Sequence, residues 1–113
     1  MSPRDAVRLR HMAEYIQEAL RFAEGRSRND LDTDRMLLFA LLRAIEVVGE
    51  AANNVSAEGR AALPGVPWSK VVGMMNRLSH AYFDVDHDLV WETVATALPA
   101  LLAYLKSMTE EEP

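Results

Sequence analysis

The segment from Thr33 to Val55, TDRMLLFALLRAIEVVGEAANNV, decides the fold of this chain. Apolar side chains recur in it at steps of three and four residues, which is the period of a helix with one buried face. They are Leu37, Leu41, Ala44, Ile45, Val48, Ala52 and Val55, and Leu38 and Leu42 widen the stripe. So wide a stripe indicates contact with more than one neighbour. We therefore expect this segment to be the longest helix and the centre of a bundle, with surface left for a subunit contact.

The residues before this segment predict one more long helix, from about Asp5 to Glu24. Its apolar positions share one face, and Gly25 ends it. The following residues, SRNDLD, are typical of a short polar loop. Asp32 or Thr33 can then cap the central helix, because a short side-chain oxygen accepts hydrogen bonds from the free amides of the first turn.

The residues after the central segment predict a short helix and then a third long one. Ser56 can cap the short helix, SAEGRAAL. The third main helix begins near Trp68, with Pro67 in its first turn, where a missing amide costs nothing. We expect this helix to end around Tyr82 or Phe83, before the acidic turn DVDHD.

A fourth main helix follows that acidic turn, is capped by Asp86 or Asp88, and runs to about Met108. Pro99 should kink it, because proline lacks a donor and crowds the carbonyl four residues back. No strand alternation and no internal repeat are present. The sequence therefore predicts an all-α, up-and-down bundle of four main helices plus a short helix, in a single domain spanning residues 1–113.

The composition narrows the kinds of function open to the chain. Half of its 113 residues are apolar, yet no apolar run approaches membrane-spanning length and no signal peptide begins the chain. We therefore expect a cytoplasmic protein that does not bind a membrane. The chain has no cysteine and only three scattered histidines, so no metal-ligand spacing occurs. Any chemistry is expected to proceed without a metal or another cofactor.

The net charge of −5 argues against binding nucleic acid through bulk electrostatics. A local basic patch near the N-terminus is one interpretation of five arginines, and a solvated helix face is the simpler one. These arginines are Arg4, Arg8, Arg10, Arg26 and Arg28.

The residues most suited to chemistry lie between Asn76 and Tyr82, NRLSHAY. His80 leads them, because imidazole exchanges protons near neutral pH. At about 100° per residue, Asn76 shares a helix face with His80, and Arg77 can reach toward it from a neighbouring face. The sequence thus indicates a polar cluster at the end of the third main helix.

Several of these residues also have a structural interpretation. Val71, Met75, Leu78 and Tyr82 fall on one apolar stripe, which favours Met75 as a core residue and Tyr82 as a core aromatic with its hydroxyl at the helix end.

The acidic residues elsewhere are open to similar alternatives. Glu46 and Glu50, one turn apart, could form a carboxylate pair or simply face solvent. Asp84, Asp86 and Asp88 alternate like cation ligands but lack the glycine and distal glutamate of a calcium loop, so helix capping is favoured.

Four stretches, taken in order, resemble the HepT-like toxins of the HEPN superfamily. They are AIEVVGEAA, VPWSKVVGM, NRLSHAYFDVD and VWETVATALPALLAYL, and they follow one another between residues 44 and 105. The family motif is an arginine, a polar residue that is usually asparagine, a histidine five positions after the arginine, and a tyrosine two beyond. Asn76, His80 and Tyr82 match this motif, whereas Met75 occupies the arginine position.

The resemblance implies a homodimer in which the motif arginine and histidine line a cleft between protomers and cut RNA without metal. The ribose 2′-hydroxyl would attack the adjacent phosphate, with His80 as general acid or base. Met75 has no charge and no donor, and losing one such donor typically lowers the rate by ~100- to 1,000-fold. Arg77 projects about 160° away from the Met75 position, so we expect it at most to support the site.

The resemblance also implies a partner. In this family a minimal nucleotidyltransferase acts as antitoxin and adds AMP to the motif tyrosine, here Tyr82. Added bulk and phosphate charge beside the cleft would repel the RNA substrate.

Two hypotheses follow. The first is a homodimeric HepT-like ribonuclease toxin whose activity is impaired by Met75. The alternative is a non-catalytic HEPN module that binds RNA, a nucleotide or its nucleotidyltransferase partner without cutting.

Overall fold

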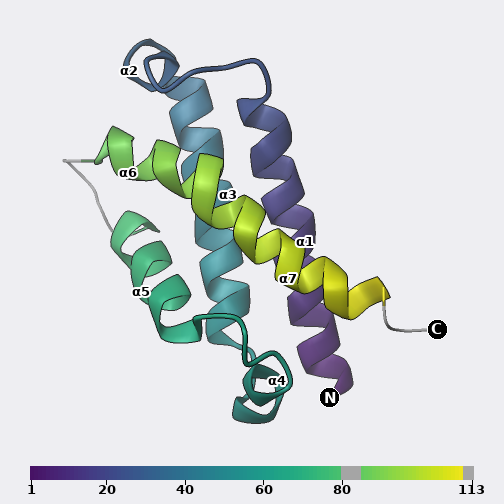
Figure 1. Ribbon diagram of the computed structural model, residues 1–113. Helices are drawn as coiled ribbons and strands as arrows, with labels where there is room; N and C mark the ends of the chain where they lie inside the picture. The colour runs from purple at the N-terminus through teal and green to yellow at the C-terminus, as the bar shows by residue number, and fades with distance from the viewer. Residues whose placement is uncertain (80–84, 111–113) are drawn as a thin grey trace.

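The computed structural model describes the backbone of residues 1–79 and 85–110, and every regular element in these ranges is helical (Figure 1). The elements are α1 (Pro3–Ala23), α2 (Asp30–Thr33), α3 (Arg35–Asn53), α4 (Ala57–Ala61), α5 (Trp68–Ser79), α6 (His87–Glu92), the π-helical segment η1 (Thr93–Ala97) and α7 (Leu98–Glu110). The predicted all-α bundle is confirmed, with two short helices, α2 and α4, where one was expected. The predicted end of the third main helix lies outside the described residues.

Helix α3 is the centre of the bundle. It runs antiparallel to α1 and packs against α1 on one side and α5 on the other, while α6 to α7 crosses both α3 and α1 obliquely (Figure 1). All seven residues of its predicted stripe are buried, as is Leu38, and Leu42 is partly buried. The predicted central role is confirmed. The predicted length is wrong, because α1 has 21 residues and α3 has 19.

The loop between α1 and α3 explains the shorter α3. Gly25 ends α1 as predicted, with a φ of 73° that favours glycine. The expected polar loop instead contains α2, a helical turn that buries Leu31 in the core. Neither Asp32 nor Thr33 caps the next helix. Asp34 does, by accepting a hydrogen bond from the Leu37 amide at 3.1 Å.

A buried carboxylate joins the starts of α1 and α4. Asp5 is 2% exposed and accepts hydrogen bonds from the amide and the hydroxyl of Ser56, at 2.9 and 2.5 Å. Ser56 also caps α4, as predicted, by accepting from the Gly59 amide at 3.1 Å. These bonds hold the pKa of Asp5 below its ordinary value, the Ser56 amide being the main cause. Asp5 thus holds α4 against the first turn of α1.

The last long helix contains a π-helical turn just before Pro99. The Leu98 amide bonds to the Thr93 carbonyl, five residues back, and Pro99 then lies in the first turn of α7. The sequence predicted a kink at Pro99, and the structure places a wider helical turn there, which accommodates the missing proline donor. Asp86 caps this helix, as predicted, by accepting from the Leu89 amide at 3.0 Å.

One stretch of the described residues, His87–Lys106, is long and apolar enough to cross a membrane by length and composition alone. This differs from the expectation that no apolar run approaches membrane-spanning length. Val90, Val94, Leu98 and Leu105 within it are each at most 1% exposed and belong to the bundle core. We therefore interpret it as the core helix of a globular bundle.

Candidate functional site

Helix α5, which carries the described part of the motif, is held at its start by Trp68. The indole Nε1 donates to the carbonyls of Arg60 and Leu63, at 3.2 and 3.1 Å. The Arg60 guanidinium lies over the indole ring, 5.7 Å from its centroid, in a cation–π contact. Pro67 lies just before the helix and its carbonyl accepts from the Val71 amide at 3.0 Å. The start of α5 is therefore well defined.

The inner face of α5 consists of Val71, Met75 and Leu78, all buried. Met75 is 1% exposed and packs against Gly49 of α3. The interpretation of Met75 as a core residue, drawn from the apolar stripe, is confirmed. Position 75, the motif's arginine position by resemblance, therefore points into the contact between α3 and α5.

The outer face of α5 presents Asn76 and Arg77, both exposed. No ion pair joins Arg77 to any residue in the described part of the chain. His80 and Tyr82, the other two predicted site residues, lie outside the described residues. The structure thus separates buried Met75 from Asn76 and Arg77, which lie on the exposed part of the helix.

An apolar groove lies beside the exposed part of α5, and the sequence analysis missed it. Its volume is about 660 Å³. It is lined by Pro67, Ser69, Lys70, Val71, Gly73, Met74, Arg77, Leu89, Ala97, Ala100, Leu101 and Tyr104. We call it the α5–α7 groove. Two cations, Lys70 and Arg77, stand two turns apart along α5. Because residues from separate helices line the groove, no local sequence signal could have indicated it.

The two glutamates of α3 face different surroundings. Glu46 is partly exposed and forms an ion pair with Arg43, with 3.0 Å between Oε1 and Nη1. Glu50 is exposed and lines a small hollow with Arg8 and His11 of α1. Glu46 therefore has a local ion-pair partner on its own helix, which is typical of a solvated helix face.

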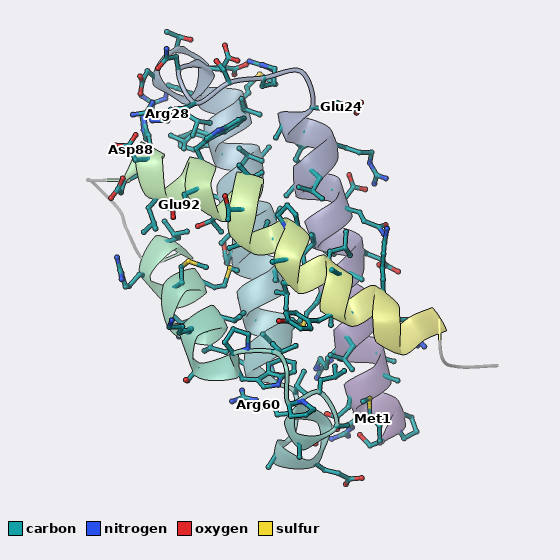
Figure 2. All side chains as sticks on the ribbon, in the orientation of Figure 1. Met1, Glu24, Arg28, Arg60, Asp88 and Glu92 are labelled. Carbon is teal, nitrogen blue, oxygen red and sulfur yellow. The ribbon has the colours of Figure 1, made fainter. Side chains whose placement is uncertain are left out.

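A charged cluster fastens the α2 turn to the start of α6, next to the undescribed residues 80–84. Asp32 Oδ1 lies 2.7 Å from Nδ1 of His87 and accepts from Nη1 of Arg28 at 2.9 Å. Arg28 also donates to Asp88, and Figure 2 shows these two side chains pointing toward one another. Hydrogen bonding to His87 first, and then to Arg28, lowers the pKa of Asp32. We call these four residues the Asp32 cluster.

The cluster also changes the interpretation of the N-terminal arginines. Arg28 is paired with Asp32 and Asp88, and Arg26 is paired with Asp30 and Asp34. Two of the five arginines that could have formed a basic patch are therefore neutralised by neighbouring aspartates. The pKa of Asp34 is lowered, chiefly by its hydrogen bond from Arg26. Asp86 and Asp88 serve as a cap and an ion-pair partner, and Asp84 lies outside the described residues.

No group of three or more His, Asp or Glu side chains is placed to hold a metal ion within residues 1–79 and 85–110. The chemistry of the described surface is that of amide, guanidinium and ammonium groups beside an apolar groove. Such groups can bind a phosphate and stack or cover a base.

Comparison with known proteins identifies sequence relatives over most of the chain. A family model described as HepT-like, ribonuclease HepT-like, matches residues 12–108. A candidate RNase of Caldanaerobacter subterraneus subsp. tengcongensis is 32% identical over 104 residues, covering 92% of this chain and 93% of the relative. A candidate RNase of Methanocaldococcus jannaschii is 32% identical over 102 residues, covering 89% and 94%. A protein of Thermococcus cleftensis named "Probable ribonuclease HepT" is 36% identical over 92 residues, covering 78% and 84%. No solved structure matches the chain significantly.

Proposed function

Because this chain belongs to the HepT-like ribonuclease family of the HEPN superfamily, we propose that it is the toxin of a toxin–antitoxin pair and that Met75 impairs its cleavage of RNA. The family match over residues 12–108 includes the motif helix α5 and both of its flanks. The proposal that Met75 impairs cleavage rests on one observation, the burial of Met75 against Gly49.

In the proposed reaction the ribose 2′-oxygen forms a bond to the adjacent phosphorus, and the bond from phosphorus to the 5′-oxygen breaks. One general base takes the 2′-hydroxyl proton and one general acid protonates the departing 5′-oxygen. His80 is the residue of this chain suited to either role at neutral pH. Asn76, an exposed residue of α5 four positions earlier in the sequence, is proposed to donate a hydrogen bond to the substrate.

Position 75 contributes packing in this chain and no donor. A thioether that is 1% exposed can neither neutralise nor hydrogen-bond the charge that develops on the phosphoryl oxygens. Arg77 is exposed and lines the α5–α7 groove, so it can attract a substrate phosphate. Its place on the outer face does not bring it to the position of the missing guanidinium. We therefore expect this chain to retain RNA binding although its cleavage of RNA is impaired.

The proposed toxin is a homodimer in which two motif helices border one cleft. The α5–α7 groove runs beside the exposed motif residues and is largely apolar, as expected of a surface that a second protomer covers. Gly73 offers a direct test, because a Cβ added there meets no atom within 4 Å. Gly73→Arg should keep the fold, fill the groove and reduce the dimer to a monomer in light scattering.

The cleavage proposal is tested with four proteins: the unchanged chain, Met75→Arg, Met75→Leu, and Met75→Arg combined with His80→Ala. Each is incubated with labelled single-stranded RNA in EDTA, after circular dichroism confirms the fold. Only Met75→Arg should cleave well, at least ~100-fold faster than the unchanged chain. Met75→Leu is the matched control, since it preserves the core volume without adding a guanidinium. Cleavage by Met75→Arg that required added magnesium would exclude the mechanism.

A second candidate function is favoured by the same burial of Met75. Because Met75 is a core residue with no catalytic group, the chain could act as a non-catalytic HEPN module. Such a module would bind RNA, a nucleotide or the nucleotidyltransferase. RNA binding without cleavage in all four proteins, Met75→Arg included, would support this candidate and exclude the first.

We propose a minimal nucleotidyltransferase as the antitoxin, with Tyr82 as the acceptor of AMP. The family membership and the match of Tyr82 to the motif tyrosine support this assignment. Tyr15 and Tyr104 lie inside α1 and α7 and are 38% and 45% exposed. Both residues therefore serve as exposed control tyrosines for the proposed modification of Tyr82.

A further inference from the structure

A small polar hollow lies between the start of α1 and the end of α3, on elements that the proposed cleavage site does not use. Its volume is about 230 Å³. It is lined by Arg8, His11, Val47, Glu50, Ala51 and Asn54. We call it the Arg8 hollow. None of these residues belongs to α5 or lines the α5–α7 groove, so the proposed cleavage chemistry does not account for the charged groups gathered here.

The Arg8 hollow holds groups of opposite charge that the chain itself does not pair. Nε of Arg8 is buried, and no hydrogen-bond partner for it exists among the described residues. Within residues 1–79 and 85–110, neither Arg8 nor His11 forms an ion pair with Glu50, although all three line the same hollow. A buried cationic donor without a partner costs free energy unless a ligand supplies one. The hollow therefore offers a guanidinium, an imidazole and a carboxylate to a ligand.

The start of α1 is also where the N-terminal arginines keep their charge available. Arg26 and Arg28 are each paired with two aspartates. Arg4, Arg8 and Arg10 form no ion pair in the part of the chain that the structure describes. Arg4 and Arg8 are one helical turn apart, roughly 6 Å along the axis, and share a helix face. The positive charge that can attract a chain of phosphates is therefore concentrated beside the Arg8 hollow.

The chemistry of the Arg8 hollow fits a ribonucleotide. Guanidinium and imidazole groups donate to phosphate oxygens. The Glu50 carboxylate only accepts hydrogen bonds, so it needs a donor from the ligand, and the 2′-hydroxyl of a ribose supplies one. A simple inorganic anion has no use for that carboxylate and is repelled by it. Single-stranded RNA therefore matches both signs of charge in the hollow.

The size of the hollow indicates one unit of a longer ligand. Pockets that enclose a whole small molecule have volumes of about 300–1,000 Å³. The Arg8 hollow, at about 230 Å³, is smaller than these. A ligand bound here extends beyond the hollow, as one nucleotide within an RNA strand does.

We propose that the Arg8 hollow binds one nucleotide of the single-stranded RNA whose neighbouring stretch occupies the cleavage site. Arg8 and His11 bind its phosphate, and Glu50 accepts a hydrogen bond from its 2′-hydroxyl. The inference rests on the proposed function for its ligand, RNA, and adds a contact site remote from α5. Because α3 packs between α1 and α5, and packed helices lie about 8–10 Å apart, the strand spans roughly 16–20 Å between the two sites.

The first experiment measures binding of a labelled single-stranded RNA by fluorescence anisotropy, in EDTA and over a range of salt concentrations. Arg8→Gln should weaken binding roughly tenfold, because a charge-assisted hydrogen bond is lost. It should also reduce the slope of log affinity against log salt by about 0.7, the value for one phosphate contact on a single strand. Thermal unfolding checks the fold.

The matched control for Arg8→Gln is Arg10→Gln. Arg10 is exposed on the same helix, carries the same charge and does not line the hollow. Arg10→Gln should bind RNA nearly as well as the unchanged chain. Equal losses of affinity in the two variants would show attraction by overall charge and would overturn the inference.

The second experiment compares RNA with DNA of the same sequence. Glu50→Ala removes a negative charge, so it should not weaken the binding of DNA, whereas it should weaken the binding of RNA by removing the acceptor for the 2′-hydroxyl. The ratio of RNA affinity to DNA affinity should therefore fall. Glu14→Ala is the control, since Glu14 is exposed on α1, carries the same charge and does not line the hollow. An unchanged ratio in Glu50→Ala would overturn the assignment of a ribonucleotide to the hollow.

These measurements separate the inference from the proposed function. Binding is measured without cleavage, so a loss of affinity in Arg8→Gln supports the inference even if Met75→Arg does not cleave RNA. RNA binding that Arg8→Gln leaves unchanged would overturn the inference alone. A lack of RNA binding by every protein, Met75→Arg included, would overturn both. If Arg8→Gln keeps its affinity for RNA but no longer copurifies with the coexpressed nucleotidyltransferase, the hollow belongs to that partner and the inference is wrong.

Discussion

Gly49 and Met75 lie so close together that a Cβ on Gly49 would stand 2.7 Å from the Cβ of Met75. Only glycine lets α3 and α5 approach to this distance. The contact fixes the rotation of the motif helix, so that position 75 points to the core while Asn76 and Arg77 point outward. A packing contact thus determines which of the described motif residues are exposed in this chain.

Two glycine-to-alanine changes should have opposite effects on stability. Gly49→Ala should lower the free energy of unfolding by roughly 1–3 kcal/mol, because the added methyl group overpacks the contact with Met75. Gly73→Ala should raise it by about 0.5–1 kcal/mol, because alanine favours the helix and the new methyl group meets no atom within 4 Å. Urea unfolding measures both. Equal effects at the two glycines would show that α3 and α5 are not so close.

Stability should fall in acid through Asp5. Hydrogen bonds from Ser56 lower the pKa of Asp5 below its ordinary value of 3.8 in the folded chain. The unfolded chain therefore takes up the proton first, and the stabilisation is present above pH 3.8 and is lost as the pH falls through the lower folded pKa. Thermal unfolding from pH 7 to 2 should show this fall, and a smaller one in Asp5→Asn.

The matched control for Asp5 is Ser56→Ala, which removes one donor to Asp5 and the cap of α4 together. It should cost about 1 kcal/mol at neutral pH from the lost cap alone. Its acid dependence should be weaker than that of the unchanged chain but stronger than that of Asp5→Asn, because the Ser56 amide still donates. Identical pH profiles for all three proteins would contradict the assigned role of Asp5.

Arg28 should hold the first turn of α6. Its bonds to Asp32 and Asp88 connect the α2 turn to this helix, so Arg28→Ala should speed amide hydrogen exchange at residues 87–92. Arg26→Ala is the control, because Arg26 pairs with Asp30 and Asp34 in the same loop and does not reach α6. Exchange should be measured by mass spectrometry of peptides. The same acceleration in both variants would show a general loosening of the loop.

Tyr82 should be the acceptor of AMP. Incubation with the cognate nucleotidyltransferase, ATP and magnesium should add one or more AMP units to this chain, and Tyr82→Phe should gain none. Tyr15→Phe and Tyr104→Phe should be modified as well as the unchanged chain, although both tyrosines are exposed. Intact-mass spectrometry with peptide mapping provides the measurement, and a Tyr82→Phe chain that still gains the mass of AMP would identify another acceptor.

The helices and the core could largely be predicted from the sequence, because their signals are local. The apolar stripe of α3, the cap by Ser56 and the stop at Gly25 each depend on residues within a turn or two of one another. The boundary near α2 could not be placed, because the burial of Leu31 depends on how the helices pack and not on a local pattern. The motif itself could be recognised, since its residues lie within eight positions.

The sequence by itself therefore determined the all-α class, the central helix, the family and the inward-facing stripe that contains Met75. Only the tertiary structure decided the ion pair between Arg28 and Asp88, the groove beside α5 and the exposed large apolar side chains of α1 and α3. The physical reason is distance along the chain. Hydrophobic periodicity is set by neighbours three and four residues apart, whereas the ion pair between Arg28 and Asp88 joins residues 60 positions apart and depends on how whole helices pack.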